Sequence, residues 1–312
     1  MPARRSLTVA AAQTGPVLTP DDMRPGVAAA CTMVERAAEQ GAEVICFSEL
    51  FLTPFFPNRL EHAFEHWFLT LPDPVVQPLF DAARRNEMAM IFPYGERDGR
   101  HHYNSAAVIG RDGRVIGTYR KTHIPAIFPS NLKGGTGSYE KFYFTPGDTG
   151  FRAWRTSQGT IGVLVCWDQW FPEGARLTAL QGAEILFYPT AIGWHPSERR
   201  EYGKAQHQSW EVVQRSHAIA NGCYVCAPNR TGREHILDAR GRPVSRDGIQ
   251  FWGQSFVAAP DGQVVKRAPA DRESVLVVDC DLDRVEFSRT HWPFLRDRRI
   301  DAYGDLTKRF TD

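Results

Sequence analysis

The chain has 312 residues, of which 42% are hydrophobic, and its formal net charge at pH 7 is +1. This length suits one large domain or two medium ones, and the composition is that of an ordinary globular protein. The balanced charge gives no indication of nucleic-acid binding or of an anionic membrane surface, and no apolar run approaches the length of a membrane span. We therefore expect neither nucleic acid nor a membrane as a partner.

The amino-terminal residues and the cysteines favour a cytoplasmic location. Residues 1–5 are basic, but the apolar run 6–12 is too short for the core of a secretory signal. The six cysteines are scattered through the chain, which is typical of free thiols in a reducing compartment. Cys223 and Cys226 have the spacing of a redox or metal pair, but no second pair of ligands lies nearby, so we expect a structural role for them.

The amino-terminal part predicts neighbouring parallel strands. Residues 7–13 have a strand pattern, 27–40 have helical spacing, and 43–47 form a second, short apolar strand. A β-α-β order favours parallel strands with the helix on one face of the sheet. The second strand delivers Glu49 at its end. The aromatic stretch 51–68 is then either core packing under a long loop or a hydrophobic wall beside Glu49, and both can hold.

The middle of the chain predicts antiparallel strands. Its expected elements are a helix at 75–86 and strands at 88–93, 103–109, 114–119, 151–154 and 161–165. Asp-Gly pairs at 98–99 and 112–113 signal hairpins. Lys121 follows the second of these hairpins at a strand end. Glu140 lies in a Gly-rich, charged loop at 128–143.

One stretch, 159–182, predicts a buried strand, a sharp corner and a helix. The strand pattern leads to Cys166, a polar and aromatic corner follows, and Pro172 precedes a helical pattern closed by Gly182. A cysteine just before a helix N-terminus meets backbone N–H groups and a dipole that favour the thiolate. The alternative is a small hydrophobic residue buried at a strand end.

The rest of the chain shows no domain linker, repeat or low-complexity segment. Its expected elements are strands at 184–188, 223–228, 254–259, 263–267 and 275–280, helices at 205–221 and 282–288, a loop at 190–202 and a polar, meandering segment at 232–249. The Asp-Gly pair at 261–262 signals a third hairpin. The tail 291–303 is rich in arginine and cannot bury itself alone. We expect one α/β domain with mixed sheets over residues 1–312.

Three strand ends thus offer Glu49, Lys121 and Cys166. In an α/β sheet, residues just past the carboxyl ends of strands converge on one crevice. A carboxylate can take the thiol proton, the thiolate can attack a carbon that bears nitrogen, and an ammonium can stabilise the developing oxyanion together with a backbone N–H after the cysteine. Singly, a glutamate or lysine at a strand end is usually only solvated, so the prediction rests on the joint pattern.

Four segments, at 47–50, 119–123, 165–168 and 171–173, resemble the signatures of the nitrilase, or carbon–nitrogen hydrolase, superfamily. The likeness covers nearly the whole chain and keeps the order of the motifs. It implies a four-layer α-β-β-α sandwich and a mechanism without metal or organic cofactor. By the same resemblance Glu49 matches the general base, Lys121 the oxyanion lysine and Cys166 the nucleophile. Glu140 matches a second glutamate that orients the lysine and the substrate nitrogen.

The resemblance also implies self-association. Protomers of this superfamily usually pair across the helix layer and often assemble further, so we expect a homodimer or higher homo-oligomer. The tail 291–312 resembles the segment that packs on the partner subunit.

Within the superfamily, residues 140–151, 166–173 and 180–193 are very similar to the N-carbamoylputrescine amidases. This resemblance implies a small-molecule N-carbamoyl amine or amide as substrate, and hydrolysis of a terminal ureido group to an amine, carbon dioxide and ammonia. The residues expected to contact the substrate are Trp167, Trp170, Ala191 and Trp194.

The residues after the nucleophile bear on the substrate. Similar amidases for N-carbamoyl-D-amino acids carry an arginine pair there to hold the substrate carboxylate, whereas this chain has Gln169 and Trp170. Trp170 can face an alkyl chain or a cationic amine, or it can pack in the core.

The stretch 194–202 departs from the putrescine-type pattern. Glu198 and Glu201 can bind an amine, whereas Arg199 and Arg200 can repel one or bind a carboxylate. The alternatives are therefore an amidase for N-carbamoyl-β-alanine or another N-carbamoyl amino acid, or for a linear amide. A binding module without turnover fits poorly, because the glutamate, lysine and cysteine are all present.

Overall fold

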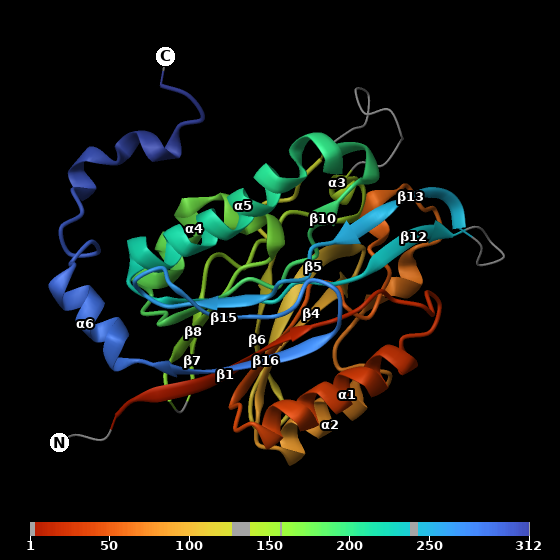
Figure 1. Ribbon diagram of the computed structural model, residues 1–312, viewed down its shortest axis with the longest axis horizontal. Coiled ribbons are helices and arrows are strands. Elements are labelled where there is room, and N and C mark those ends of the chain that lie inside the picture. Colours follow the sequence, from red (N-terminus) through yellow and green to blue (C-terminus); the bar gives the residue numbers. More distant parts are fainter. Residues whose placement is uncertain (1–3, 127–137, 157, 238–242, 312) are drawn as a thin grey trace.

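The computed structural model describes residues 4–126, 138–156, 158–237 and 243–311, without the side chains of 196–198, 236–237 and 243–247. Two β-sheets lie face to face, and helices cover the outer face of each (Figure 1). The α-β-β-α sandwich of mixed sheets predicted from the sequence is therefore confirmed.

The first sheet has seven strands in the order β16-β1-β2-β4-β5-β6, with β3 paired to β4. These strands are β1 (Ser6–Gln13), β2 (Val44–Phe47), β3 (Phe68–Leu69), β4 (Ala89–Asp98), β5 (His101–Ile109), β6 (Val115–Arg120) and β16 (Ser274–Asp281). β1, β2 and β4 are parallel, as the β-α-β pattern predicts. β4, β5 and β6 are antiparallel, and Gly99 and Gly113 have the positive φ that their tight turns require.

The second sheet has six strands in the order β15-β14-β11-β9-β8-β7. They are β7 (Ala153–Arg155), β8 (Thr160–Val163), β9 (Ile185–Phe187), β11 (Tyr224–Ala227), β14 (Phe256–Ala258) and β15 (Val264–Arg267). β8, β9 and β11 are parallel, and the outer pairs are antiparallel. A small third sheet consists of β10 (Gly193–Trp194), β13 (Pro243–Phe251) and β12 (Arg233–Leu237).

Three apolar layers separate the four layers of secondary structure. Side chains of both sheets, such as Val44 and Phe187, fill the space between the sheets. α1 (Arg24–Glu39) and α2 (Gln77–Arg85) cover the first sheet, and α4 (Pro172–Leu180) and α5 (Pro196–Asn221) cover the second (Figure 1). The other α-helices are α3 (Glu140–Tyr143) and α6 (Asp283–His291).

The sequence-based predictions were wrong in three segments. α5 begins at Pro196 instead of residue 205, because proline is favourable in the first turn of a helix and a single glycine, Gly203, is tolerated in a helix interior. The polar segment 232–249 contains the hairpin strands β12 and β13, whose pairing is set by the backbone and not by an apolar pattern. Of the predicted loop 128–143, residues 128–137 lie outside the described residues, and residues 140–143 form the short helix α3 instead of a loop.

This topology brings three strand ends together. β2, β4 and β6 run in the same direction, so β2 and β6 end at the same edge of the first sheet. β8 of the facing sheet ends shortly before Cys166. Among the described helices, none has the length and hydropathy that crossing a membrane requires. Beyond α6 the chain leaves the body of the sandwich (Figure 1).

Candidate active site

Glu49 lies two residues past β2 and its side chain is fully buried. Its carboxylate accepts three hydrogen bonds. Lys121 Nζ and Asn104 Nδ2 donate to Oε1 at 2.9 and 2.7 Å, and the backbone N–H of Ala191 donates to Oε2 at 3.0 Å. These donors come from both sheets, so the carboxylate has a single orientation at the junction of the two halves of the sandwich.

Lys121 follows β6 directly and is also buried. Its Nζ donates to Glu49 Oε1 at 2.9 Å and to Glu140 Oε2 at 2.6 Å. Burial by itself lowers the pKa of Lys121, but the carboxylates of Glu140 and Glu49 outweigh this effect and raise the pKa above its ordinary value. The ammonium therefore stays charged at neutral pH.

Glu140 is the first residue of α3 and its side chain is almost fully buried. Burial raises the pKa of Glu140 from 4.5 to about 7, while the Lys121 ammonium opposes the shift and the Glu49 carboxylate adds to it. The physical reason is that two buried carboxylates share one ammonium, which leaves one excess negative charge in a medium that solvates it poorly. A proton held by Glu140 removes that excess.

Cys166 is buried beside these three residues, at a corner with φ = 41°, a left-handed conformation that only glycine adopts readily. Its backbone N–H donates to the carbonyl of Pro189 at 2.9 Å. Burial and the Glu49 carboxylate raise the pKa of the Cys166 thiol well above its ordinary value, although the Lys121 ammonium lowers it. The sequence-based expectation of a thiolate is not met. A 3-10 helix, Cys166–Trp170, begins at the cysteine and α4 follows at Pro172, but the burial of the thiol outweighs what these helical N–H groups offer a thiolate.

The corner after β2 resembles the cysteine corner, since Leu50 has φ = 51°. The guanidinium of the fully buried Arg230 holds this corner. Its Nε donates to the carbonyl of Glu49 at 3.0 Å, its Nη2 donates to the carbonyls of Leu50 and of Thr53 (2.9 Å for the latter), and its Nη1 pairs with Glu234 at 2.7 Å. We did not predict Arg230 from the sequence, because a lone arginine after a strand gives no sign of burial.

A cavity of about 500 Å³ opens above Cys166 and Glu140. Its walls are mostly aromatic or apolar, and its described lining residues include Phe55, Trp167, Trp170, Ala191, His195, Tyr202, Gln206, Ser209, Ile249 and Trp252. Of the four residues expected to contact the substrate, Trp167, Trp170 and Ala191 line the cavity. The fourth, Trp194, does not line it. It packs against Trp252 and His207, and the Arg199 guanidinium lies 4.9 Å from its ring centre.

In the sequence, the glutamates and arginines of the stretch 194–202 left open whether the site binds an amine or a carboxylate. His195 and Tyr202 line the cavity from this stretch, whereas Arg199, Arg200 and Glu201 do not. The side chain of Glu198 lies outside the described residues. Glu140 is the one carboxylate, and there is no guanidinium, among the described side chains that line the cavity.

The aromatic stretch 51–68 packs in the core, as one of its two interpretations predicts, and it also contributes to the cavity. Phe55 lines the cavity. Phe56, Trp67 and Phe68 instead form an aromatic cluster with Tyr143 and Phe144 at the far end of α3. Tyr143 Oη also donates to the carbonyl of Arg59 at 2.7 Å, so the cluster anchors the short helix that presents Glu140.

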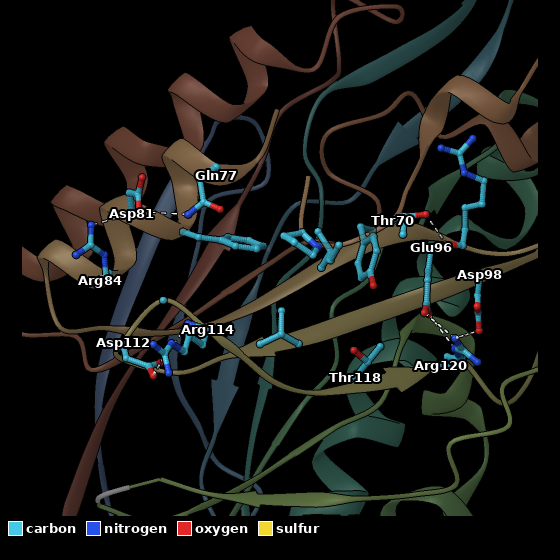
Figure 2. Close-up of a pocket in the computed structure, with 17 residues that line it drawn as sticks. Thr70, Gln77, Asp81, Arg84, Glu96, Asp98, Asp112, Arg114, Thr118 and Arg120 are labelled. Carbon is cyan, nitrogen blue, oxygen red and sulfur yellow. Dashed lines mark hydrogen bonds and ion pairs between the residues drawn. The ribbon is translucent and has the colours of Figure 1, made fainter. Parts of the chain in front are cut away.

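A larger cavity, of about 700 Å³, lies between α2 and strands β4 to β6. Figure 2 shows that Glu96, Asp98 and Arg120 form an ion-pair network at one end of it. None of Glu49, Lys121 and Cys166 lines this cavity, although Arg120 is the neighbour of Lys121 in the chain. We therefore assign the chemistry to the smaller cavity, because Cys166 and Glu140 line it and Lys121, buried next to them, is hydrogen-bonded to Glu140 and Glu49.

Comparison with known proteins agrees with this geometry. The family described as carbon-nitrogen hydrolase matches residues 8–290. An N-carbamoylputrescine amidase of Solanum lycopersicum is 41% identical over 305 residues, which are 97% of this chain and 95% of that protein. A citrullinase of Francisella tularensis is 35% identical over 276 residues, or 88% of this chain and 90% of that protein.

The same assignment follows from solved structures. The crystal structure of a carbon-nitrogen hydrolase from Helicobacter pylori G27 superposes with a TM-score of 0.85 at 36% identity, and the match covers 98% of this chain and 100% of that one. The chain belongs to the carbon–nitrogen hydrolase family and has the nitrilase fold. It is a hydrolase that acts on carbon–nitrogen bonds.

Proposed function

We propose that this hydrolase cleaves the terminal ureido group of N-carbamoylputrescine and releases putrescine, carbon dioxide and ammonia, a step of polyamine formation. The observation that carries the proposal is that Cys166 lines an aromatic cavity and that Glu49 and Lys121, hydrogen-bonded to each other, are buried beside it. The choice of N-carbamoylputrescine as substrate is supported by the N-carbamoylputrescine amidase of Solanum lycopersicum, which is 41% identical over most of both chains.

In this mechanism the resting thiol of Cys166 is neutral, as its raised pKa requires, and Glu49 takes its proton as Sγ attacks the carbamoyl carbon. The carbonyl oxygen becomes an oxyanion, which Lys121 Nζ and the backbone N–H of Trp167 stabilise. One nitrogen then leaves with the proton held by Glu49, and a thiocarbamate remains on Cys166.

The second half of the reaction regenerates the thiol. Glu49 removes a proton from water, the hydroxide attacks the thiocarbamate, and Cys166 leaves and recovers a proton. The released carbamic acid decomposes to carbon dioxide and the second nitrogen product. Glu140 contributes by holding Lys121, to which it is hydrogen-bonded at 2.6 Å, and by facing the cavity.

The cavity walls favour an amine over an acid. Trp167, Trp170, Tyr202 and Trp252 provide aromatic surfaces, and the faces of such rings attract an alkyl ammonium. A substrate carboxylate would call for an arginine, and the described lining contains none. The competing candidate is a ureido acid, and the 35% identity to a citrullinase favours it.

Ammonia release from a substrate panel tests the proposal. The panel contains N-carbamoylputrescine, citrulline, N-carbamoyl-β-alanine, an N-carbamoyl-D-amino acid and a simple linear amide, each over a range of concentrations. We expect the largest kcat/KM for N-carbamoylputrescine. A larger kcat/KM for any ureido acid or for the linear amide would overturn the substrate assignment and leave the cysteine mechanism in place.

We also propose that the chain is one domain that forms a homodimer or higher homo-oligomer, with the tail 291–312 packed on a partner subunit. Large apolar side chains of this segment are exposed, among them Trp292, Ile300, Leu306 and Phe310 at 66%, 71%, 66% and 76%. α4 and α5 likewise expose Leu177, Leu180, Val212 and Ile219. Sedimentation of the full chain and of a chain ending at 290 checks this, because loss of the tail should weaken association.

The cysteines support a cytoplasmic location. All six are free, and five of them are buried. Free thiols persist in a reducing compartment. Localisation of the full-length chain by fractionation checks this proposal.

A further inference from the structure

The fully buried carboxylate of Asp168 connects the cysteine corner to the segment that carries Lys121. It accepts four hydrogen bonds, from the backbone N–H of Val165 (3.0 Å), Tyr119 Oη (2.8 Å), the backbone N–H of His123 (3.0 Å) and His123 Nδ1 (2.7 Å). We propose that Asp168 is a positioning residue that fixes the Cys166 thiol relative to the Lys121 ammonium.

On one side, Asp168 closes the cysteine corner. Its Oδ2 accepts from the N–H of Val165, and its own N–H donates to the carbonyl of Val165 at 3.0 Å. Cys166 lies inside this ring with φ = 41°. A non-glycine residue keeps such a conformation only where its surroundings enforce it. The two bonds between Val165 and Asp168 provide that enforcement.

On the other side, Asp168 holds the strand end that presents Lys121. Tyr119 and His123 lie two residues before and two residues after the lysine, and both donate to the same carboxylate. The His123 ring also stacks on Phe171, with ring centres 3.7 Å apart and an interplanar angle of 3°. The segment around Lys121 therefore has the same anchor as the nucleophile corner, although the two belong to different sheets.

A carboxylate is the one side-chain group that satisfies this arrangement. Each of its two oxygens accepts from a backbone N–H, Oδ1 from His123 and Oδ2 from Val165. In the variant Asp168→Asn, one of these positions becomes an NH₂ group. Either orientation of the amide then places a donor against a backbone N–H, which cannot turn away or accept a hydrogen bond. The side-chain volume is unchanged, so the variant tests the bonds and not the packing.

The experiment compares Asp168→Asn with Tyr119→Phe, which removes one of the four donors, and with Glu96→Gln as a matched control. Glu96 also accepts hydrogen bonds from a residue next to Lys121, Arg120, but both line the larger cavity (Figure 2), which Cys166 does not line. Two measurements are made. Steady-state kinetics give kcat and KM with the best substrate of the panel, and mass spectrometry gives the rate at which iodoacetamide alkylates Cys166.

We expect Asp168→Asn to lower kcat about 100-fold, because a small displacement of the reacting groups has an effect of that size. KM should stay within about threefold, because the cavity walls are intact. Tyr119→Phe should lower kcat about three- to tenfold, as expected for one hydrogen bond. Alkylation of Cys166 should slow in both variants, because the thiol is no longer aligned with Glu49. Glu96→Gln should stay within about twofold of the wild type in both measurements.

A folded Asp168→Asn variant with kcat and alkylation within about twofold of the wild type would overturn the proposal. An equal loss in Glu96→Gln would also overturn it, because the effect would then belong to β6 in general. If circular dichroism shows that Asp168→Asn does not fold, Tyr119→Phe decides, and an unchanged kcat in that variant rejects the role. The proposal depends on the hydrolase activity but not on the identity of the substrate, and the alkylation rate separates a displaced thiol from a wrong substrate.

Discussion

Two corners of the backbone meet at the active site, and they are held in opposite ways. At the corner after β2, carbonyl groups of Glu49, Leu50 and Thr53 point at the buried cation Arg230. At the corner after β8, the backbone N–H of Val165 points at the buried anion Asp168. Each corner contains one non-glycine residue with positive φ.

The two corners differ in which backbone groups they leave unpaired, and this decides whether the buried side chain is positive or negative. A guanidinium only donates hydrogen bonds and a carboxylate only accepts them, so a turn that leaves carbonyls unpaired needs a cation and a turn that leaves N–H groups unpaired needs an anion. Neither charge takes a direct part in the proposed chemistry. Both hold strained backbone at the positions where Glu49 and Cys166 must face each other.

The largest expected effect on activity comes from removing the Cys166 thiol or the Glu49 carboxylate. Asp168 and Arg230, which hold the two corners, remain in place in these variants. Cys166→Ala and Glu49→Gln should each reduce ammonia release to background, because no nucleophile or no base is left. Both variants should keep the wild-type circular dichroism spectrum. Cys226→Ala, a buried cysteine of the same core, is the matched control and should keep its kcat. Wild-type turnover in Cys166→Ala would refute the mechanism.

Lys121 is hydrogen-bonded to Glu49 and lies on the segment that Asp168 anchors, so it belongs to both corners. Lys121→Ala should lower kcat by about two to three orders of magnitude, as the loss of an oxyanion donor does. Steady-state kinetics of ammonia release measure this effect. A loss of less than about tenfold would mean that the lysine does not contact the reacting oxygen.

Arg230→Lys tests the corner after β2. The lysine keeps the charge, but one ammonium cannot reach three carbonyls and Glu234 at once. We expect the free energy of unfolding to fall by about 2–4 kcal/mol, because buried carbonyl groups lose their donors. Denaturant unfolding measures the loss, and kcat should fall with it because Glu49 is displaced.

The matched control for this variant is Arg120→Lys. Arg120 also pairs with several carboxylates, but it lies at the edge of the larger cavity, away from both corners. Its replacement should cost about 1 kcal/mol or less, because the lysine keeps the charge and two of the three carboxylate partners, Asp98 and Asp148, are largely exposed. Equal losses in the two variants would remove the distinction between a group that holds a corner and an ordinary ion pair.

The smallest expected effect is a dependence of the free energy of unfolding on pH, which Glu140 introduces. Because the pKa of Glu140 is raised to about 7, the folded protein holds a proton that the unfolded chain releases near 4.5. This residue therefore makes the fold less stable as pH rises from about 4.5 to about 7. In Glu140→Gln that decline should disappear from denaturant unfolding curves recorded at several pH values. The same decline in the variant would assign the proton to another group.

Much of the fold and of the site could be predicted from local patterns. The apolar strands, the Asp-Gly turns and the residues at strand ends predicted that Glu49, Lys121 and Cys166 converge on one crevice. The missed features have a common cause. Nothing local to Arg230 or Asp168 says that either is buried, and the early start of α5 at Pro196 lies in a polar stretch without apolar periodicity.

The sequence alone determined the class of the protein, because the strand periodicity and the order of its motifs are local properties of the chain. Only the tertiary structure decided how the site is held. Asp168 joins residues 119–123 of one sheet to residues 165–168 of the other, and Arg230 reaches back to residues 49–53. Such hydrogen bonds join residues that are far apart in the sequence. They depend on which unpaired backbone groups lie close together once the sheets have packed, and local sequence patterns do not contain this information.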